Sequence, residues 1–152
     1  MKTLETTRLI LRDWVDNDLS CGIHTDEIIK YLIEAKNNYA VVFKETGAVI
    51  GTIGLNEDAD DIPHRRNVGV RIAEQYRNIG LMSEALTEIF ANNKGKEFSW
   101  FCKVDDERSR HLAEKFGFEY IKTFPKVQRN EKEVPSDYYY YVLKVQSALC
   151  EV

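Results

Sequence analysis

The chain has 152 residues, of which 43% are hydrophobic and 30% charged, and its formal net charge is −4 at pH 7. A chain of this length can bury one core, so we expect a single domain over residues 1–152. The mildly acidic balance argues against nucleic acid or an anionic membrane as the main partner. Because no apolar run is long enough to span a membrane and the first residues lack a signal-peptide layout, we expect a cytoplasmic protein.

The three cysteines, Cys21, Cys102 and Cys150, lie far apart in the sequence. Their odd number and wide spacing match neither a disulfide framework nor a metal-binding motif. We therefore expect reduced thiols and no metal site.

The N-terminal part of the chain is predicted to form strands and one helix. Its apolar residues follow the pattern of strands in three segments, Arg8–Arg12, Tyr39–Lys44 and Ala48–Leu55. The segment Asp26–Ala35 carries apolar residues at helical spacing, which predicts an amphipathic helix. We therefore expect strand, helix, strand, strand in this order.

The middle of the chain contains the most informative stretch, a predicted strand Asn67–Ala73 followed by a loop and a predicted helix Gly80–Asn93. The helix is indicated by apolar residues that recur at the spacing of one buried face, namely Met82, Ala85, Leu86, Ile89 and Phe90. A strand that enters a helix through a glycine-bearing turn directs backbone N–H groups and the positive end of the helix dipole at one point, which suits an anion. The loop is neither a P-loop nor a three-glycine dinucleotide motif, so an ordinary strand-to-helix connection is the alternative.

The C-terminal part is predicted to contain strands Phe98–Val104, Glu119–Phe124 and Tyr138–Val145 and a helix Glu107–Phe116. Gly117 follows that helix as a C-terminal glycine should. Four consecutive tyrosines on the last strand must alternate between its faces, Tyr139 and Tyr141 on one and Tyr138 and Tyr140 on the other. We favour packing as their role over lining of an acceptor tunnel. The mixture of strands and helices predicts an α/β (α+β) layered sheet.

Four segments in the same order resemble the RimJ/RimL-type branch of the GNAT N-acetyltransferases. They are ETTRLILRDW at Glu5–Trp14, VIGTIGL at Val49–Leu55, the strand, loop and helix around Gly80, and DERSRHLAEKFGF at Asp106–Phe118. This resemblance implies a GNAT-like acyl-CoA N-acyltransferase fold, with a mixed central sheet flanked by helices. It also implies acetyl-CoA as co-substrate and an amine-bearing acceptor as partner.

The resemblance carries over a set of residues that bind acetyl-CoA. Main-chain groups of Val70, Arg71 and Ile72 would meet the pantetheine arm. The pyrophosphate would lie on the loop and first helical turn, at Arg77, Asn78, Ile79, Gly80, Leu81, Met82 and Ser83. Met82 stands where the family often has glycine or alanine. Asp106 and Ser109 would lie near the thioester, and Asp106 replaces the asparagine that the family prefers, so that it accepts hydrogen bonds without donating them.

Two residues are candidates for the chemistry of transfer. By the resemblance, the Ser109 hydroxyl lies near the thioester, where it would protonate the departing thiolate, whereas its other interpretation is local bonding in the first turn of a helix. The family often places a basic glutamate where this chain has Asn67, which cannot be a base. Glu57 and then Asp58 are the candidates to replace it as general base, although both are also interpretable as solvated loop acids. Histidine is a residue type suited to a general base, but His64 is also interpretable as part of an exposed loop.

The expected reaction is direct attack of a neutral primary amine on the thioester. The resemblance favours a protein or peptide N-terminus as the acceptor. An α-amino group, with a pKa near ~8, also needs less help to lose its proton than a lysine, with a pKa near ~10.4. A small-molecule amine, such as a polyamine or an aminoglycoside, is the competing acceptor. A non-catalytic or degenerate acyl-CoA-binding domain is the rival, favoured by Asn67, by Asp106 and by a shortened region between Arg12 and Tyr39. The oligomeric state, monomer or homodimer, is left open.

Overall fold

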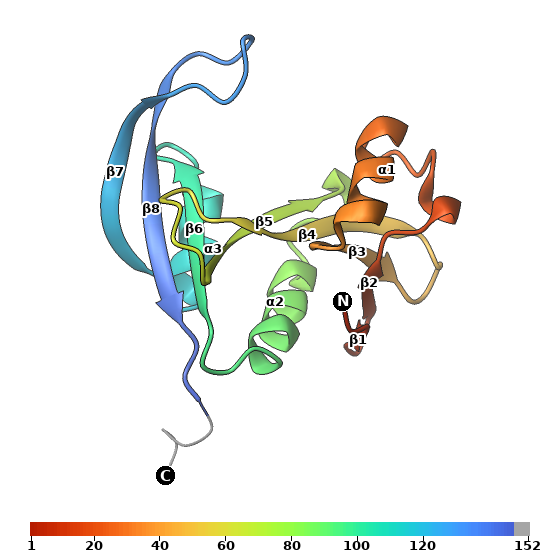
Figure 1. Ribbon diagram of the computed structural model, residues 1–152. Helices are drawn as coiled ribbons and strands as arrows, with labels where there is room; N and C mark the ends of the chain where they lie inside the picture. The colour runs from red at the N-terminus through yellow and green to blue at the C-terminus, as the bar shows by residue number, and fades with distance from the viewer. Residues whose placement is uncertain (148–152) are drawn as a thin grey trace. The chain divides into compact units, whose positions relative to one another are not determined.

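The computed structural model describes residues 1–147 (Figure 1). Its three helices are α1 (Asp26–Ala35), α2 (Leu81–Ala91) and α3 (Glu107–Lys115), and its two 3-10 turns are Asp16–Asp18 and Glu74–Tyr76. Its strands are β1 (Leu4–Glu5), β2 (Leu9–Asp13), β3 (Asn38–Phe43), β4 (Val49–Glu57), β5 (Arg65–Ile72), β6 (Glu97–Lys103), β7 (Glu119–Val127) and β8 (Ser136–Lys144).

The chain divides into two compact units that are interleaved along the sequence. Unit 1 consists of Met1–Asn56 and Gly69–Asn93, and unit 2 of Glu57–Val68 together with the chain from Lys94 onward. Strand β5 contributes its first half to unit 2 and its second half to unit 1. Hydrogen bonding orders the strands β1-β2-β3-β4-β5-β6-β8-β7. The sheet is mixed, because β5 and β6 are parallel, whereas the pairs β1–β2, β2–β3, β3–β4, β6–β8 and β7–β8 are antiparallel.

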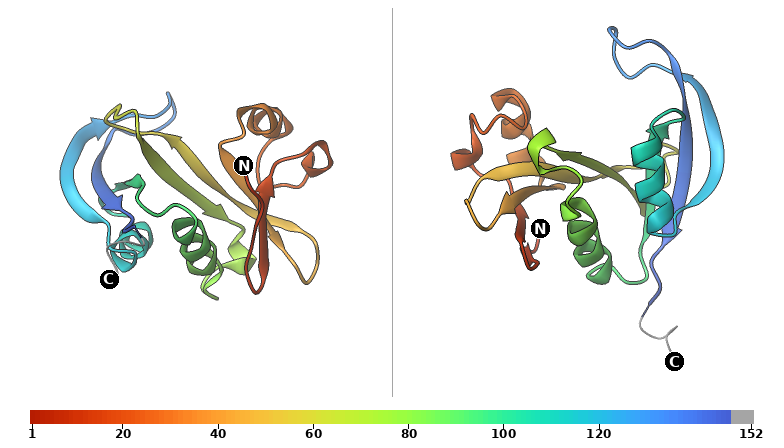
Figure 2. Two further views of the ribbon diagram at one scale, coloured as in Figure 1. Left: turned by 60° about the horizontal axis from the view of Figure 1, so that its bottom comes forward. Right: turned by 180° about the vertical axis from the view of Figure 1, so that it is seen from behind.

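Unit 1 is a sheet with one helix on each face. Strands β1 to β4 pair antiparallel in sequence order, and α1 and α2 lie on opposite faces of them (Figures 1 and 2). Under α1, a cluster of buried apolar side chains forms the core: Trp14, Ile23, Ile29, Leu32 and Ala40. The buried residues of α2 are Leu81, Ala85, Leu86, Ile89 and Phe90, so the helical spacing read from the sequence marks its core face, with Met82 only half-buried.

Unit 2 is built on β6, β8 and β7. Strand β8 pairs antiparallel with both neighbours, and α3 packs against β6 (Figure 2). The start of β5 joins this sheet through a parallel ladder of three residue pairs, which runs from Arg65 opposite Glu97 to Asn67 opposite Ser99. Large aromatic side chains fill the core, among them Phe98, Trp100, Phe118, Tyr138, Tyr140 and Tyr141.

The predicted strands and helices are confirmed, with ends that differ by a few residues. The bounds of α1 coincide with the prediction. Gly117 has the left-handed φ of +84° that a glycine after a helix adopts. The strand β1 and the two 3-10 turns were not predicted, because two or three residues carry no periodic pattern.

The four tyrosines alternate across β8 as expected. Tyr138 stacks on Phe101 with ring centroids 4.6 Å apart, and Tyr140 meets Phe124 edge-on. Tyr139 and Tyr141 both contact Tyr120 instead. The aromatic run is therefore a packing element of unit 2, the interpretation favoured from the sequence.

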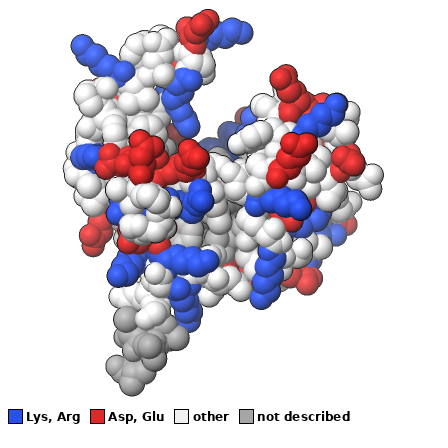
Figure 3. All heavy atoms as spheres, viewed as in Figure 1, with Lys and Arg blue, Asp and Glu red and all other residues white. Residues whose placement is uncertain are grey.

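The remaining sequence expectations concern cysteines, charge and membranes. Cys21 is half-buried and Cys102 buried, both without a disulfide, whereas Cys150 lies outside the described residues. On the face that Figure 3 shows, basic and acidic side chains are interspersed. Within residues 1–147, none of the helices has the length and apolarity needed to cross a membrane.

Candidate active site

In unit 1, the loop between β5 and α2 makes a sharp reversal just before the helix. Asn78 has a φ of +65° and Gly80, which caps α2, a φ of +81°. The left-handed region is costly for side chains with a Cβ and open to glycine. The local sequence therefore explains this turn, because Gly80 occupies the position from which the helix starts.

The start of α2 supplies the donors for an anion. Glu84 makes the first helical hydrogen bond back to the Gly80 carbonyl, at 3.0 Å. The amides of Leu81 and Met82, which precede Glu84, have no acceptor four residues back in the helix. Together with the helix dipole they form a positive end suited to phosphate.

Arg77 is engaged within the loop. Its amide donates to the Glu74 carbonyl at 3.2 Å, and its Nε donates to the Ile72 carbonyl at 3.2 Å. Of the predicted cradle, the segment from Gly80 to Met82 is the part best placed to offer amides. Arg77 instead ties the loop to the end of β5, where Ile72 belongs to the predicted pantetheine strand.

That predicted strand, Val70 to Ile72, lies in the half of β5 that belongs to unit 1. It passes so close to β4 that a Cβ added to Gly51 would collide with the Arg71 carbonyl. Glycine at position 51 therefore allows the two backbones to approach. The Arg71 side chain is exposed, and its charge, after burial, lowers the pKa of His24.

An unexpected ion pair anchors the loop to the first hairpin. Arg8 Nη1 donates to the Ile79 carbonyl at 3.0 Å, while Arg8 Nε donates to Glu84 Oε1 at 2.8 Å. The other carboxylate oxygen of Glu84 accepts from the Thr6 hydroxyl at 2.5 Å and from the Arg8 amide at 2.9 Å. Burial alone would raise the pKa of Glu84, but the hydrogen bonds from Thr6 and Arg8 lower it below its ordinary value. Sequence reasoning missed Glu84, because nothing local links it to residues 76 or more positions away.

In unit 2, Asp106 and Ser109 form the start of α3. Asp106 caps the helix by accepting from the Ser109 amide at 3.1 Å. The Ser109 hydroxyl accepts from the Trp100 indole N–H at 2.9 Å and lies within hydrogen-bonding reach of the Cys102 thiol. Ser109 therefore ties α3 to β6, and its predicted acid role stays a prediction.

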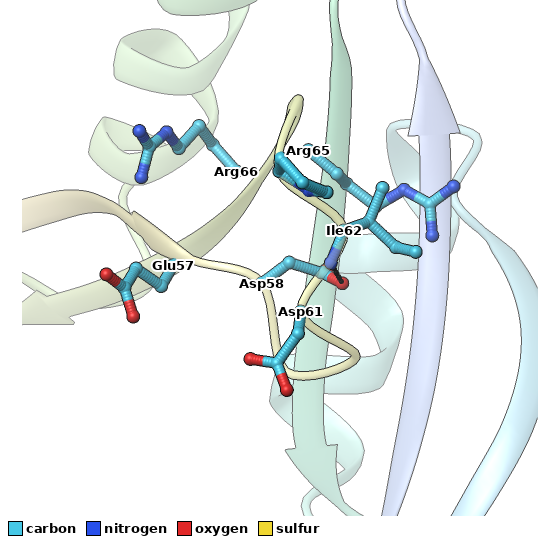
Figure 4. Close-up of a pocket in the computed structure, with 7 residues that line it drawn as sticks. Glu57, Asp58, Asp61, Ile62, Arg65 and Arg66 are labelled. Carbon is cyan, nitrogen blue, oxygen red and sulfur yellow. Dashed lines mark hydrogen bonds between the residues drawn. The ribbon is translucent and has the colours of Figure 1, made fainter.

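The two candidate carboxylates at the end of β4 differ sharply in their exposure to solvent. Glu57 is exposed, whereas Asp58 is only 5% exposed. Figure 4 shows their side chains pointing to opposite sides of the chain. Both lie at a hollow of about 180 Å³ whose other lining residues are Asp61, Ile62, Pro63, Arg65 and Arg66.

Asp58 is a fixed anion. Its carboxylate accepts from the Tyr140 hydroxyl at 2.7 Å and from the amides of Asp60 and Ile62 at 3.0 and 3.3 Å. The Ser99 hydroxyl also favours the charged form of Asp58 and so lowers its pKa. Burial alone would raise the pKa of Asp58, but these donors together lower it below its ordinary value. A carboxylate so stabilised is a weak base.

Asp58 belongs to a chain of polar contacts across unit 2. Arg65 Nη1 donates to the Tyr140 hydroxyl at 2.9 Å, and Arg65 also pairs with Glu97 at 2.9 Å. His64 Nε2 reaches the other oxygen of Glu97 at 3.1 Å. In the same unit, Asn67 Nδ2 donates to Ser99 Oγ at 3.3 Å. Sequence reasoning weighed Asp58, Asn67 and His64 singly and missed this network. The one signal for it was the cluster of charged residues between β4 and β5.

The predicted site residues thus form two groups, each placed within its own unit. Unit 1 holds the residues predicted for the pantetheine and the pyrophosphate, Val70–Ile72 and Arg77–Ser83. Unit 2 holds Glu57, Asp106 and Ser109. Within unit 2, Asp106 contacts Ser109 directly, and none of the hydrogen bonds or ion pairs recorded for residues 1–147 links Glu57 to either.

Comparison with known proteins shows the family to which the chain belongs. The Acetyltransferase (GNAT) domain family matches residues 11–119, well over half of the 152 residues. The chain therefore belongs to the GNAT family and is an acetyltransferase of the GNAT type. This confirms the family and the mixed-sheet fold expected from the sequence. No curated protein matches the chain.

Solved structures share the fold at low sequence identity. The GNAT-family acetyltransferase from Bacillus anthracis is 20% identical with a TM-score of 0.76, over 94% of this chain and 98% of that one. The Salmonella typhimurium acetyltransferase that modifies the N-terminal serine of ribosomal protein L7/L12 is 15% identical with a TM-score of 0.73, over 95% and 100%. The Microcin C7 self-immunity acetyltransferase, in complex with acetyl-CoA and AMP, is 16% identical with a TM-score of 0.66, over 79% and 69%.

Proposed function

We propose that this protein transfers an acetyl group from acetyl-CoA to a primary amine, and that the acceptor is the N-terminal amine of a protein or peptide. Membership of the GNAT family supports acetyl transfer. The RimJ/RimL-like segments of the sequence support an N-terminal amine, as does the fold shared with an enzyme that modifies the N-terminal serine of L7/L12. An α-amine also needs less help than lysine to lose its proton at neutral pH.

The observation that carries the proposal is the turn at Gly80. Its left-handed φ of +81° starts α2 at a point where the Leu81 and Met82 amides face outward from the helix end. These groups fit a pyrophosphate, because they are donors at the positive end of a helix dipole. The only carboxylate in the first turn, Glu84, is held by Arg8 and Thr6, which offsets its repulsion of an anion.

In the proposed reaction, the neutral amine attacks the thioester carbonyl carbon. A C–N bond forms, the C–S bond breaks, the amine loses one proton to solvent, and the thiolate gains one. Ser109 is the proposed donor to the thiolate, and its hydroxyl regains a proton from solvent. Because its hydroxyl already contacts Trp100 and Cys102, this donation requires the hydroxyl to turn away from Cys102.

The test combines calorimetric titration of acetyl-CoA with thiol release on a panel of amines. The panel includes peptides with N-terminal serine or alanine, the same peptides with a blocked N-terminus and a free lysine, a polyamine and an aminoglycoside. We expect micromolar binding and thiol release only with free N-termini. Release with the polyamine or the aminoglycoside alone would replace the peptide acceptor by a small molecule.

A specific observation favours one rival function, a domain that binds acyl-CoA without catalysis. Asn67 occupies the position where the family often has a base, and its side chain is tied to Ser99. Acetyl-CoA binding without thiol release on any amine of the panel would establish this rival. Absence of binding would overturn both.

A further inference from the structure

We infer that Arg8 is a positioning residue for the proposed pyrophosphate site, where it holds the peptide between Ile79 and Gly80 so that the Gly80 N–H stays available to the phosphate. The inference rests on the proposed function, since it names a further residue on which acetyl-CoA binding depends. All of the residues concerned lie in unit 1. Arg8 acts across the fold, on a turn 71 positions away in the sequence.

Arg8 is itself held firmly at the start of α2. It ends the short connection between β1 and β2, where its amide donates to Glu84 Oε2 at 2.9 Å and its carbonyl accepts from the Lys44 amide at 2.9 Å. Arg8 Nε donates to Glu84 Oε1 at 2.8 Å, and the Thr6 hydroxyl donates to Glu84 Oε2 at 2.5 Å. Both the backbone and the guanidinium of Arg8 are therefore fixed relative to the helix.

The guanidinium of Arg8 also lies against the turn that precedes the helix. Arg8 Nη1 donates to the Ile79 carbonyl at 3.0 Å, and Arg8 Nη2 is 3.6 Å from the position that a Cβ on Gly80 would take. One planar group thus bonds Glu84 through one nitrogen and Ile79 through another. This use of two separate donors needs the fork of an arginine, because a lysine has a single nitrogen.

The bond to the Ile79 carbonyl sets the direction of the next N–H. In a trans peptide, the carbonyl of one residue and the N–H of the next point in opposite directions, and residues 1–147 contain no cis peptide. With the Ile79 carbonyl directed at Arg8, the Gly80 N–H points away from Arg8. Gly80 is exposed, and within residues 1–147 none of the recorded hydrogen bonds engages its N–H. This donor is therefore available to a ligand beside the Leu81 and Met82 amides.

The turn needs such an anchor because glycine permits a second orientation of the peptide. Rotation of the peptide between residues 79 and 80 changes the ψ of Ile79 and the φ of Gly80, and glycine adopts either sign of φ at little cost. In the rotated form, a carbonyl oxygen would replace the N–H and repel a phosphate. Asn78, with a φ of +65°, is also in a sparsely populated region, which persists only where neighbouring structure holds it.

The first test measures acetyl-CoA affinity by calorimetry in Arg8→Ala, with Lys44→Ala as the matched control. Loss of a hydrogen bond from a charged donor shifts the balance between the two peptide orientations about tenfold or more. We therefore expect Kd to rise about tenfold, because only the remaining population binds. Lys44 Nζ also holds the β1–β2 connection, through Glu5 and the Thr6 carbonyl, and has no recorded contact with the turn within residues 1–147. We expect its Kd to stay within about twofold of wild type. Equal rises in both variants would reduce Arg8 to a matter of charge or hairpin stability and overturn the inference.

The second test separates positioning from charge. Arg8→Lys keeps the positive charge but not both bonds, so we expect at least about a fivefold loss of affinity. The double variant Arg8→Ala, Glu84→Gln removes both charges of the pair. If Arg8 only neutralised Glu84, the double variant would bind acetyl-CoA as wild type does. We expect it to stay about tenfold weaker. Recovery to within about twofold of wild type, in either variant, would contradict the positioning role.

CoA is a second ligand for the same variants, because it carries the same pyrophosphate without the acetyl group. The loss in Arg8→Ala should agree for CoA and acetyl-CoA within about twofold. A loss confined to acetyl-CoA would place the effect at the thioester and reject the assignment to the turn. Urea denaturation of each variant completes the set: a lower unfolding midpoint with unchanged Kd would show a purely structural contact.

Wild type distinguishes failure of this inference from failure of the proposed function. If wild type binds neither acetyl-CoA nor CoA, the proposed function fails and the role of Arg8 falls with it. If wild type binds both and transfers the acetyl group while the variants depart from the pattern above, only the role of Arg8 falls.

Discussion

The loop before α2, in unit 1, and the polar network around Asp58, in unit 2, are built in opposite ways. The loop is made of consecutive residues, offers backbone amides and carries exposed side chains. The network is made of side chains from the β4–β5 connection, β5, β6 and β8, and its central members Asp58, Ser99 and Tyr140 are buried. The difference teaches that a backbone site depends on local conformation, whereas a side-chain site depends on the packing of distant strands.

The largest effect is expected from Asp58→Ala, which tests whether the network is the rigid part. Loss of the carboxylate leaves the Tyr140 hydroxyl and two amides unsatisfied inside unit 2. We expect the free energy of unfolding to fall by about 3–5 kcal/mol, measured by urea denaturation. The control is Glu57→Ala at the exposed neighbour, where a change within about 0.5 kcal/mol is expected. Similar losses at both positions would contradict the contrast.

The next effect is expected from Gly80→Val, which tests the backbone site. A β-branched side chain is strained at a φ of +81°. If binding requires the native turn, the strain of roughly 2–3 kcal/mol must be overcome on binding. We then expect acetyl-CoA affinity, measured by calorimetry, to fall about 30–150-fold.

Gly47→Val is the matched control for that experiment. Gly47 has a similar φ of +75°, and no atom lies within 4 Å of the position its Cβ would take. Its substitution should lower stability and leave acetyl-CoA affinity unchanged. An unchanged affinity in Gly80→Val as well would remove the pyrophosphate from this loop.

A smaller effect is expected from Ser109→Ala, which separates packing from chemistry at the start of α3. Removal of the hydroxyl leaves the buried Trp100 N–H without its acceptor, so we expect a loss of about 1–2 kcal/mol in stability. If Ser109 also protonates the thiolate, kcat falls by at least about tenfold. An unaffected kcat with lower stability would withdraw the acid role and leave Ser109 as a structural link between α3 and β6.

The smallest effect concerns pH. The donors around Asp58 lower its pKa in the folded protein. At pH values between the folded and the unfolded pKa, the unfolded chain therefore binds more protons than the folded protein. Stability must then rise with pH through the interval between the folded and the unfolded pKa, and be lost as pH falls through the folded pKa. We expect the slope of the free energy of unfolding against pH, at pH values below the ordinary pKa of an aspartate, to be shallower in Asp58→Asn than in wild type. An identical slope would show that Asp58 is not the group that titrates.

Much of the fold was predictable because its signals are local. The spacing of the apolar residues predicted α1 with the bounds it has. In α2 it identified four buried residues, whereas its fifth, Met82, is half-buried and the buried Leu81 was not predicted. The alternation of the four tyrosines followed from strand geometry alone. β1 was not predicted, because two residues are too few to show a periodic pattern. It is a strand because Leu4 and Glu5 pair with β2.

The candidate site was predictable only in its backbone part. Gly80 indicates a turn, because glycine adopts backbone conformations that other residues avoid. The sequence by itself therefore determined the loop and the start of α2, and its four ordered segments determined the family. Only the tertiary structure decided that Asp58 is buried while Glu57 is exposed, that Glu84 holds Arg8, and that Asn67 meets Ser99. The physical reason is that these contacts join residues tens of positions apart. Which side chains meet is set by strand order and register, and no period in a single sequence encodes either.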